Sequence, residues 1–360
     1  MLLAPPTTDS SSVVKMVQGI SNILLPILVG AIMLTIGWRR NEIALVFNLI
    51  DHPDGMRKVH DAPTPLVGGL MFLACALILI GLNYFWMVND NQHDQRLYLV
   101  AAIIIPHGIL GMTDDRYSVP AAARLTYSLS LIAAVLATDR TLVMRTYYFS
   151  FGLSFELSSQ LSYMAIVLFI VFFVYAVNMI DGLNGVLAIY GVILLGVFSV
   201  WLLRGSEVYF LCALITLSIF LAFNLAGAIF AGDGGSYIIG ASAAVLFLHL
   251  YEQAFDTRSF PIDMIVVAAF VPGVDAIRVS LARWQRGASI FSADRNHLHH
   301  ILSDRFCTTK ALVAYSIVAA FPVGIAVLNP KLTWAGLIAA VTLYSVAIYS
   351  PIPRTHRPSQ

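Results

Sequence analysis

Four short polar segments of this sequence carry carboxylates, amides and imidazoles in patterns that suit chemistry on phosphate groups. Each is a cluster of ionisable and glycine residues between long apolar stretches. The segments read Gly111-Met-Thr-Asp-Asp-Arg-Tyr117, Asn178-Met-Ile-Asp-Gly-Leu-Asn-Gly185, Phe230-Ala-Gly-Asp-Gly-Gly-Ser236 and Ser289-Ile-Phe-Ser-Ala-Asp-Arg-Asn-His-Leu-His-His300.

The acidic residues of the first three segments fit a site for a divalent cation. Asp114 and Asp115 are adjacent carboxylates, which repel each other unless a cation or a proton lies between them. Asn178 and Asp181 are three residues apart, so a helix would present both oxygens on one face. Asp233 lies among glycines, where the backbone can approach a ligand closely. Such oxygen ligands suit Mg²⁺, which binds one or two carboxylates together with substrate phosphates.

The fourth segment supplies donors for phosphate oxygens. His297, His299 and His300 offer ring N–H groups, and Arg295 offers a guanidinium. The alternative for these histidines is a zinc site, which we disfavour because the nearest following thiol, Cys307, is not adjacent to the run. Taken together, the four segments predict a magnesium-assisted phosphoryl-transfer site.

Each segment also has an ordinary structural interpretation. An Asp pair at a helix end is commonly a cap or a solvated corner, and the segment from Asp181 to Gly185 has the composition of a turn. The glycine-rich segment around Asp233 can be a plain loop. Asp275 and Arg278 are expected to form a buried ion pair, since charges within membrane segments must be matched. The predicted site therefore rests on the combination of segments.

The elements that position these segments are set by an unusually apolar composition. Of the 360 residues, 59% are hydrophobic and 11% are charged, with a mean hydropathy of +0.81, against about 25% charged in soluble domains. The balance of 21 basic and 20 acidic residues excludes a nucleic-acid-binding protein that works through bulk positive charge. Three scattered cysteines exclude a disulfide framework. The sequence indicates a polytopic membrane protein.

Eleven apolar runs have the length of about 20 residues that a bilayer requires of a helix. No stretch between them is long enough for a separate soluble domain, so we expect one all-α transmembrane domain over residues 1–360, with 332–350 as an extra C-terminal helix. The predicted spans are 18–37, 67–88, 97–112, 125–138, 161–179, 186–203, 208–225, 236–252, 261–280, 311–328 and 332–350.

Basic residues predict the orientation of the chain, because cytoplasmic loops are enriched in them. Most Lys and Arg residues fall in the segments that alternation places on the side of the 38–66 loop. This pattern favours an external N-terminus and a cytoplasmic C-terminus. All four polar segments would then meet at the cytoplasmic face.

At these residues the sequence resembles the polyprenyl-phosphate N-acetylhexosamine-1-phosphate transferases, also called glycosyltransferase family 4. The resemblance extends in the family order over residues 60–300. The matching pieces are His60 through Pro65-Leu-Val-Gly-Gly69, Asp114-Asp115-Arg116, Asn178-x-x-Asp-Gly-x-Asn-Gly185, Phe230-x-Gly-Asp-x-Gly-Ser236 and Asp294-Arg-x-His-x-His-His300.

The resemblance implies a helical bundle and a reaction. A polyprenyl (undecaprenyl) phosphate in the membrane would attack the β-phosphorus of a UDP-N-acetylhexosamine, release UMP and start a lipid-linked cell-surface polysaccharide. It also implies Mg²⁺ as cofactor, with Mn²⁺ as the alternative ion, and the bacterial cytoplasmic (inner) membrane as location. A homodimer is one assembly that it allows, and no nucleic acid is expected as partner.

The resemblance also implies roles for individual residues. Asp233 matches the family's magnesium ligand, with Asn178 as a second ligand. The matching catalytic positions are Asp114, Asp115, Asp181, His297, His299 and His300. The matching substrate-binding positions are His60, Gly182, Leu183, Asn184, Asn224, Phe230 and Arg295, with Phe230 placed to stack on uracil.

Three departures from the family pattern refine this expectation. Asn184 stands where many bacterial members have Asp, and Ala231-Gly-Asp-Gly-Gly replaces the commoner Met-Gly-Asp-Ala-Gly. The histidine run is interrupted by Leu298, unlike the triplet of the peptidoglycan-precursor (MraY) branch. This last feature favours the WecA-like branch and a simple UDP-amino sugar such as UDP-GlcNAc over a muramoyl-pentapeptide donor.

Two other functions remain open from the residues alone. Acidic residues at a membrane edge also mark secondary transporters and ion pathways, although the paired broken helices of repeat-built transporters are not visible in the sequence. An inactive relative with a scaffolding role is the third interpretation.

Overall fold

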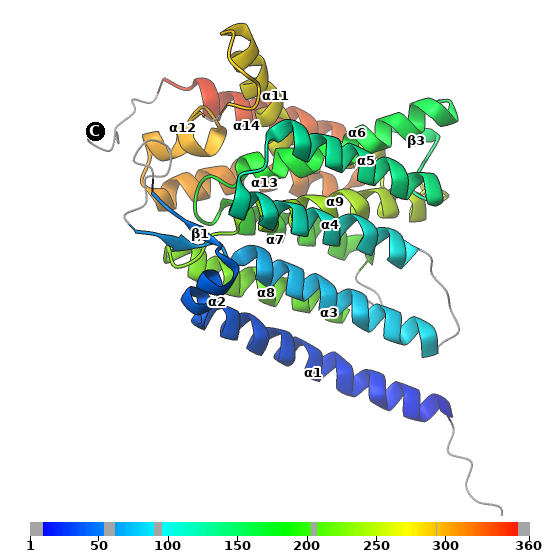
Figure 1. Ribbon diagram of the computed structural model, residues 1–360. Helices are drawn as coiled ribbons and strands as arrows, with labels where there is room; N and C mark the ends of the chain where they lie inside the picture. The colour runs from blue at the N-terminus through cyan, green and yellow to red at the C-terminus, as the bar shows by residue number, and fades with distance from the viewer. Residues whose placement is uncertain (1–9, 54–61, 90–95, 203–206, 293, 352–360) are drawn as a thin grey trace, which may run out of the picture.

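The computed structural model describes residues 10–53, 62–89, 96–202, 207–292 and 294–351, which form a bundle of long helices (Figure 1). The described chain thus confirms a polytopic helical protein. The first helices of the bundle are α1 (Ser10–Trp38), α2 (Arg40–Phe47), α3 (Gly68–Asn89), α4 (Arg96–Tyr117), α5 (Ala121–Thr138), α6 (Ser159–Ile180) and α7 (Val186–Leu202). The remaining helices are α8 (Glu207–Leu225), α9 (Gly232–Gln253), α10 (Ile262–Ala268), α11 (Phe270–Gln285), α12 (Leu298–Arg305), α13 (Thr308–Leu328), the 3-10 turn η1 (Pro330–Leu332) and α14 (Thr333–Tyr349).

When helices are counted as membrane spans by their length and hydropathy, fewer qualify than the eleven that we predicted. Within the described residues, six helices are long and apolar enough to cross a membrane, or up to eight if each of two bent pairs is one span. Every predicted run does fall on a helix or a bent pair. The runs at α3 and α7 form shorter apolar helices, and α4 does not meet the criterion, so the count of eleven is not confirmed.

The predicted span 261–280 is a bent pair of helices in the structure. Its two halves, α10 and α11, meet at an angle of 66°. Pro272 lies in the first turn of α11, where it has no N–H to donate to the carbonyl of Ala268. That carbonyl instead accepts a hydrogen bond of 3.0 Å from the hydroxyl of Tyr190 on α7. A side chain from a helix distant in the sequence therefore supplies the hydrogen bond that the Ala268 carbonyl lacks at the bend.

Helix α9 forms the centre of the bundle. It packs against α3, α4, α6 and α7. Of its most apolar 18-residue stretch, 78% is buried. Glycines allow this close packing: a Cβ on Gly240 would lie 2.9 Å from the Cα of Val174 on α6. A Cβ on Gly111 of α4 would collide with the backbone of Asp233. The helix that carries Asp233 is thus held rigidly by backbone contacts.

Two short antiparallel pairs of strands add to the helices. Strands β1 (Ile50–Asp51) and β2 (Thr64–Pro65) pair near the start of α3. Strands β3 (Thr146–Tyr148) and β4 (Ser154–Glu156) form a hairpin in which Tyr147 stacks on Phe155. Figure 1 shows β1, α2 and α12 at one end of the bundle and β3 at the other.

Candidate active site

The four polar segments meet at the end of the bundle that carries β1 and α12 (Figure 1). The backbone N–H of Asp233 donates to Asp115, and the amide of Asn178 donates to Asp233. The ring of His299 lies directly against Gly182. These contacts bring together four segments that lie far apart in the sequence, and their role as one site stays a prediction.

Asp233 is the centre of the polar cluster. Its Oδ1 accepts a hydrogen bond of 2.8 Å from the Nδ2 of Asn178, which also donates to Ser236 at 2.9 Å. Its Oδ2 lies 3.1 Å from the guanidinium of Arg124 on α5, and the same guanidinium nitrogen donates to Asp114. Two carboxylates from different helices therefore face a single positive charge.

Arg124 belongs to the polar cluster, although we did not predict it as a site residue. The same nitrogen that contacts the two carboxylates also lies 3.3 Å from the hydroxyl of Tyr237. A signal was available in principle, because Arg124 follows Asp114 closely, at the start of the next helix.

Asp115 is placed differently from its neighbour Asp114. Its two oxygens accept the backbone N–H groups of Asp233 at 2.8 Å and of Gly234 at 3.1 Å. A carboxylate there stabilises the positive end of α9. Gly232 has a φ of +68° and leaves no room for a Cβ beside the Asp115 carboxylate. Asp115 thereby fixes the loop that presents Asp233.

The chemistry of these groups fits a hard divalent cation. Mg²⁺ requires only one or two protein carboxylates and takes its other ligands from water and phosphate, and Asp114 and Asp233 already converge on one cationic group. The amide nitrogen of Asn178 faces Asp233. To act as a metal ligand, Asn178 would have to present its amide oxygen to the ion instead. The described residues hold no group of three or more His, Cys, Asp or Glu side chains that could bind a metal, so Asp114 and Asp233 would need ligands from water and substrate phosphate to hold the ion.

The segment from Asp181 to Gly185 is held in place by Asn224. The Oδ1 of Asn224 accepts from the N–H of Gly185 at 2.6 Å, and its Nδ2 donates to the carbonyl of Ile229 at 2.9 Å. Asn224, predicted to bind substrate, is thus buried between two loops and joins their backbones. Burial, together with the charges of Asp233 and Asp115, raises the pKa of Asp181 to about 7.

His299 and His300 of the fourth segment lie next to each other, with 4.2 Å between their ring centroids. His299 is 1% exposed, and neither of its nitrogens has a hydrogen-bond partner within the described chain. Burial, followed by the neighbouring His300 and His297, lowers the pKa of His299. Burial and then the charge of Arg295 lower the pKa of His300 to about 4. Both shifts favour the neutral form of the ring, which has one N–H to donate.

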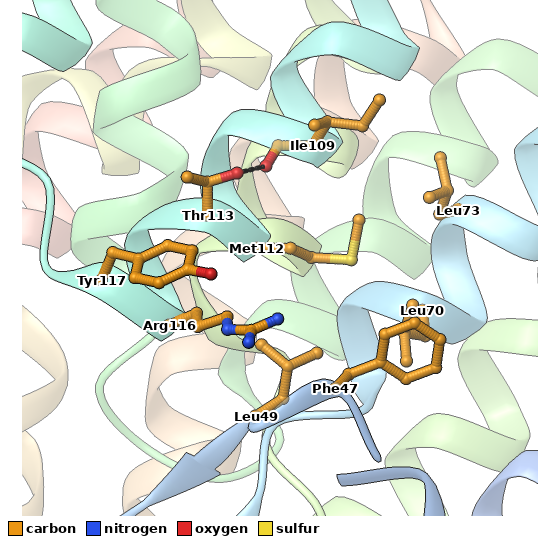
Figure 2. A pocket seen from close by; sticks show the side chains of 9 residues that line it. All are labelled: Phe47, Leu49, Leu70, Leu73, Ile109, Met112, Thr113, Arg116 and Tyr117. Carbon is orange, nitrogen blue, oxygen red and sulfur yellow. Dashed lines mark hydrogen bonds between the residues drawn. The ribbon is translucent and has the colours of Figure 1, made fainter. Parts of the chain in front are cut away.

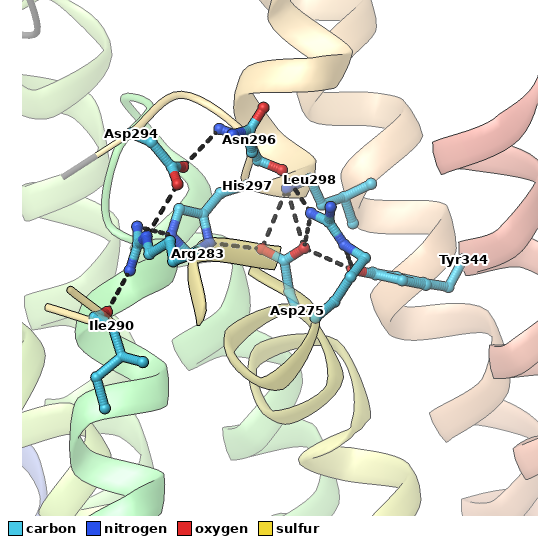
Figure 3. A network of polar contacts seen from close by, with 9 residues as sticks. Asp275, Arg283, Ile290, Asp294, Asn296, His297, Leu298 and Tyr344 are labelled. Atoms are coloured by element: carbon cyan, nitrogen blue, oxygen red, sulfur yellow. Dashed lines mark hydrogen bonds and ion pairs between the residues drawn. The ribbon is translucent and has the colours of Figure 1, made fainter. Parts of the chain in front are cut away.

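His297 instead uses both ring nitrogens in a buried network (Figure 3). Its Nδ1 lies 2.8 Å from Asp275 and its Nε2 lies 3.4 Å from Arg283. The predicted ion pair between Asp275 and Arg278 is confirmed at 2.8 Å. Arg295, predicted to bind substrate, lies 3.4 Å from Asp304.

Two further predicted positions lie at the edge of the cluster. The backbone of Phe230 donates to Pro65 at 2.9 Å and accepts from Gly68 at 3.0 Å, so the family segment at 65–69 joins the Phe230 loop. Leu183 and Asn184 are half-buried in the loop after α6. His60 lies outside the described residues.

Two pockets lie apart from the polar cluster. One of about 320 Å³ lies between α4 and the first turns of α3, beside Phe47 and Leu49 (Figure 2). Its lining is Phe47, Leu49, Leu70, Leu73, Ile109, Met112, Thr113, Arg116 and Tyr117. The other, of about 550 Å³, lies among α3, α7, α8 and α9. None of the described acidic residues of the cluster lines either pocket.

Comparison with known proteins gives a consistent family. The sequence model described as "Glycosyl transferase family 4" matches residues 97–251. "Undecaprenyl-phosphate alpha-N-acetylglucosaminyl 1-phosphate transferase" of Yersinia pestis is 26% identical, with 85% of this chain and 84% of the relative covered. "Probable undecaprenyl-phosphate N-acetylglucosaminyl 1-phosphate transferase" of Bacillus subtilis is 30% identical, with 82% of each covered. The chain belongs to glycosyl transferase family 4.

A third relative, "Decaprenyl-phosphate N-acetylglucosaminephosphotransferase" of Mycobacterium leprae, is 29% identical over 83% of this chain and 82% of its own length. The family 4 match from 97 to 251 contains Asp114, Arg124, Asn178 and Asp233. The histidine run lies beyond it, and the structure attaches that run to the family 4 region through the contact of His299 with Gly182. The resemblance inferred from the motifs is thereby confirmed.

Proposed function

We propose that this chain transfers N-acetylglucosamine-1-phosphate from UDP-GlcNAc to a polyprenyl phosphate, such as undecaprenyl phosphate, and releases UMP. The observation that carries the proposal is the agreement of the relatives' names over more than four fifths of the chain: each is a transferase of N-acetylglucosaminyl 1-phosphate to a polyprenyl phosphate. The cluster around Asp233 supplies the charged groups that such a phosphoryl transfer requires.

The reaction breaks one phosphoanhydride bond and forms another. An oxygen of the acceptor phosphate attacks the β-phosphorus of UDP-GlcNAc, the bond from that phosphorus to the bridging oxygen breaks, and the bridging oxygen leaves with UMP. Mg²⁺, which Asp233 would hold with Asp114 or Asn178, would supply positive charge to the phosphate oxygens. Arg124 supplies a second positive charge beside the same carboxylates.

The neutral histidines are suited to bind the diphosphate. The ring nitrogens of His299 and His300 can donate N–H groups to its oxygens, and such charge-assisted hydrogen bonds are stronger than neutral ones. His299 lies against Gly182, so the diphosphate would bind beside the point where the histidine run meets the Asp181 loop. In this arrangement Asp181 and Asn184 would lie near the nucleotide.

Initial-rate measurements of UMP release test the function. Purified protein in detergent with undecaprenyl phosphate, UDP-GlcNAc and Mg²⁺ should release UMP and form a lipid-linked diphospho-sugar, whereas a muramoyl-pentapeptide donor should give no product. Omitting undecaprenyl phosphate is the control, because UMP release would then have no acceptor. Movement of the nucleotide sugar across proteoliposome membranes without any UMP release would favour the transporter interpretation instead.

We also propose that the protein lies in the bacterial cytoplasmic membrane with the candidate site facing the cytoplasm, where nucleotide sugars are available. A reporter fused after Gln360 should then be cytoplasmic and one fused before Met1 should be external, because the basic residues gather on the side of the polar segments. The measurement is reporter activity on each side of the membrane. If both termini lie on the same side, one of the predicted spans does not cross the membrane.

A further inference from the structure

Asp275 lies at the centre of a network that joins three helices and the histidine run (Figure 3). It is 1% exposed. Its oxygens accept from the Tyr344 hydroxyl of α14 at 2.5 Å, from Arg278 at 2.8 Å and from the backbone N–H of Leu298 at 3.1 Å. A carboxylate buried so deeply is stable only when its lone pairs are used in this way.

The direction of these hydrogen bonds fixes the protonation of His297. A carboxylate surrounded by donors can only accept, so the Nδ1 of His297, 2.8 Å from Asp275, must carry the proton. The guanidinium of Arg283 can also only donate, so the Nε2 of His297, 3.4 Å from an Arg283 nitrogen, must accept with a lone pair. His297 is 6% exposed. The network therefore selects one neutral tautomer and leaves His297 no nitrogen for a phosphate.

The ring of His297 in turn supports His299. The two imidazoles are nearly parallel, with 5.8 Å between centroids and 5° between planes. The other side of His299 meets Gly182, where any side chain would collide with the ring. His299 is thus held between His297 and the Asp181 loop.

Helix α14 holds the histidine run from both ends. Tyr344 contacts Asp275 near the start of α12, and Arg305 at the end of α12 donates to the carbonyls of Ala347 at 2.5 Å and Ile348 at 2.9 Å. These carbonyls belong to the last turn of α14, where a cation is favourable. The C-terminal helix has thereby a structural connection to the candidate site.

We propose that Asp275 and Tyr344 are positioning residues that hold His297 in its Nδ1–H tautomer and so fix His299 and His300 for the diphosphate. The partner of a histidine commonly sets its tautomer and ring orientation in this way. The proposal rests on the proposed function for its consequence in catalysis, but the tautomer of His297 is a property of the protein alone.

The decisive variant is Asp275→Asn. If the asparagine NH₂ faces the Nδ1 of His297, the proton must move to Nε2, where it opposes Arg283. Nitrogen-15 NMR of histidine-labelled protein, with His297→Gln to identify the signal, should show Nδ1–H in the wild type and the other tautomer or a mixture in the variant. UMP release should fall by about 10- to 100-fold, with the KM for polyprenyl phosphate unchanged.

Tyr344→Phe keeps the proposal testable if Asp275→Asn does not fold. It removes one hydroxyl and keeps the ring, which packs edge-on against Phe270 with 6.0 Å between the ring centroids. We expect kcat to fall about tenfold, while Tyr349→Phe, a change of the same type at a residue 77% exposed on the same helix, should have no effect.

Two results would overturn the proposal. One is a folded Asp275→Asn protein in which His297 keeps the wild-type tautomer. The other is a Tyr344→Phe protein whose kcat, calculated per folded molecule, equals that of the wild type. Absence of UMP release from the wild type would contradict the proposed function instead, and the NMR comparison would still decide the tautomer.

Discussion

Asp233→Asn should abolish turnover while the protein stays folded and inserted in the membrane. We expect a loss of at least about 1,000-fold, equivalent to about 4 kcal/mol in the activation free energy. The Asp233 carboxylate accepts from Asn178 on one oxygen and from Arg124 on the other. An asparagine would oppose one of these donors with its own NH₂, and an amide is a poor replacement for an anionic ligand of Mg²⁺.

The measurement is the initial rate of UMP release over a range of Mg²⁺ concentrations, with thermal unfolding as the test of folding. Asp256→Asn is the matched control, because Asp256 is exposed beyond the other end of α9. Near-normal, magnesium-dependent activity of Asp233→Asn would refute the assignment of this residue.

Arg124→Met should reduce kcat by about 100-fold, with a smaller loss for Arg124→Lys. One guanidinium nitrogen of Arg124 contacts both Asp114 and Asp233, and removing it leaves two carboxylates without their shared counter-charge. Lysine keeps the charge but lacks the planar fork that can contact two carboxylates together. The loss should persist at saturating Mg²⁺ if Arg124 also acts on the substrate phosphates.

Rates at low and saturating Mg²⁺ distinguish this role from simple charge balance. Full recovery of Arg124→Met at high Mg²⁺ would mean that the arginine only compensates the carboxylates, and the prediction would then be wrong. Arg140→Met is the control, since Arg140 is exposed just beyond the other end of α5.

The helical architecture could be predicted because each apolar run is long and uninterrupted. What the sequence did not reveal are the interruptions that depend on distant groups. The bend between α10 and α11 requires both Pro272 and the hydroxyl of Tyr190 from α7, and no local pattern connects these two residues. The strands β1 and β2 are too short to give an alternating pattern.

The candidate site was predictable at the level of segments and less so at the level of roles. Asp114 and Asp115 are adjacent in the sequence, but neighbouring residues of a helix point about 100° apart. Asp114 therefore contacts Arg124, while Asp115 binds the backbone at the start of α9. Likewise, His297 resembles His299 and His300 in the sequence, and only the position of Asp275 shows that its nitrogens are already used.

The contact between Gly111 and Asp233 has a consequence for how the catalytic end of the protein can evolve. Because the α4 and α9 backbones touch there, the register between the two helices is fixed, and Asp114 keeps its place relative to Asp233. Inserting a single residue between Gly111 and Asp114 would rotate the acidic pair by about 100° around α4 and separate it from Arg124. Changes in length should therefore be tolerated in the loops that connect the helices and rejected within this turn of α4.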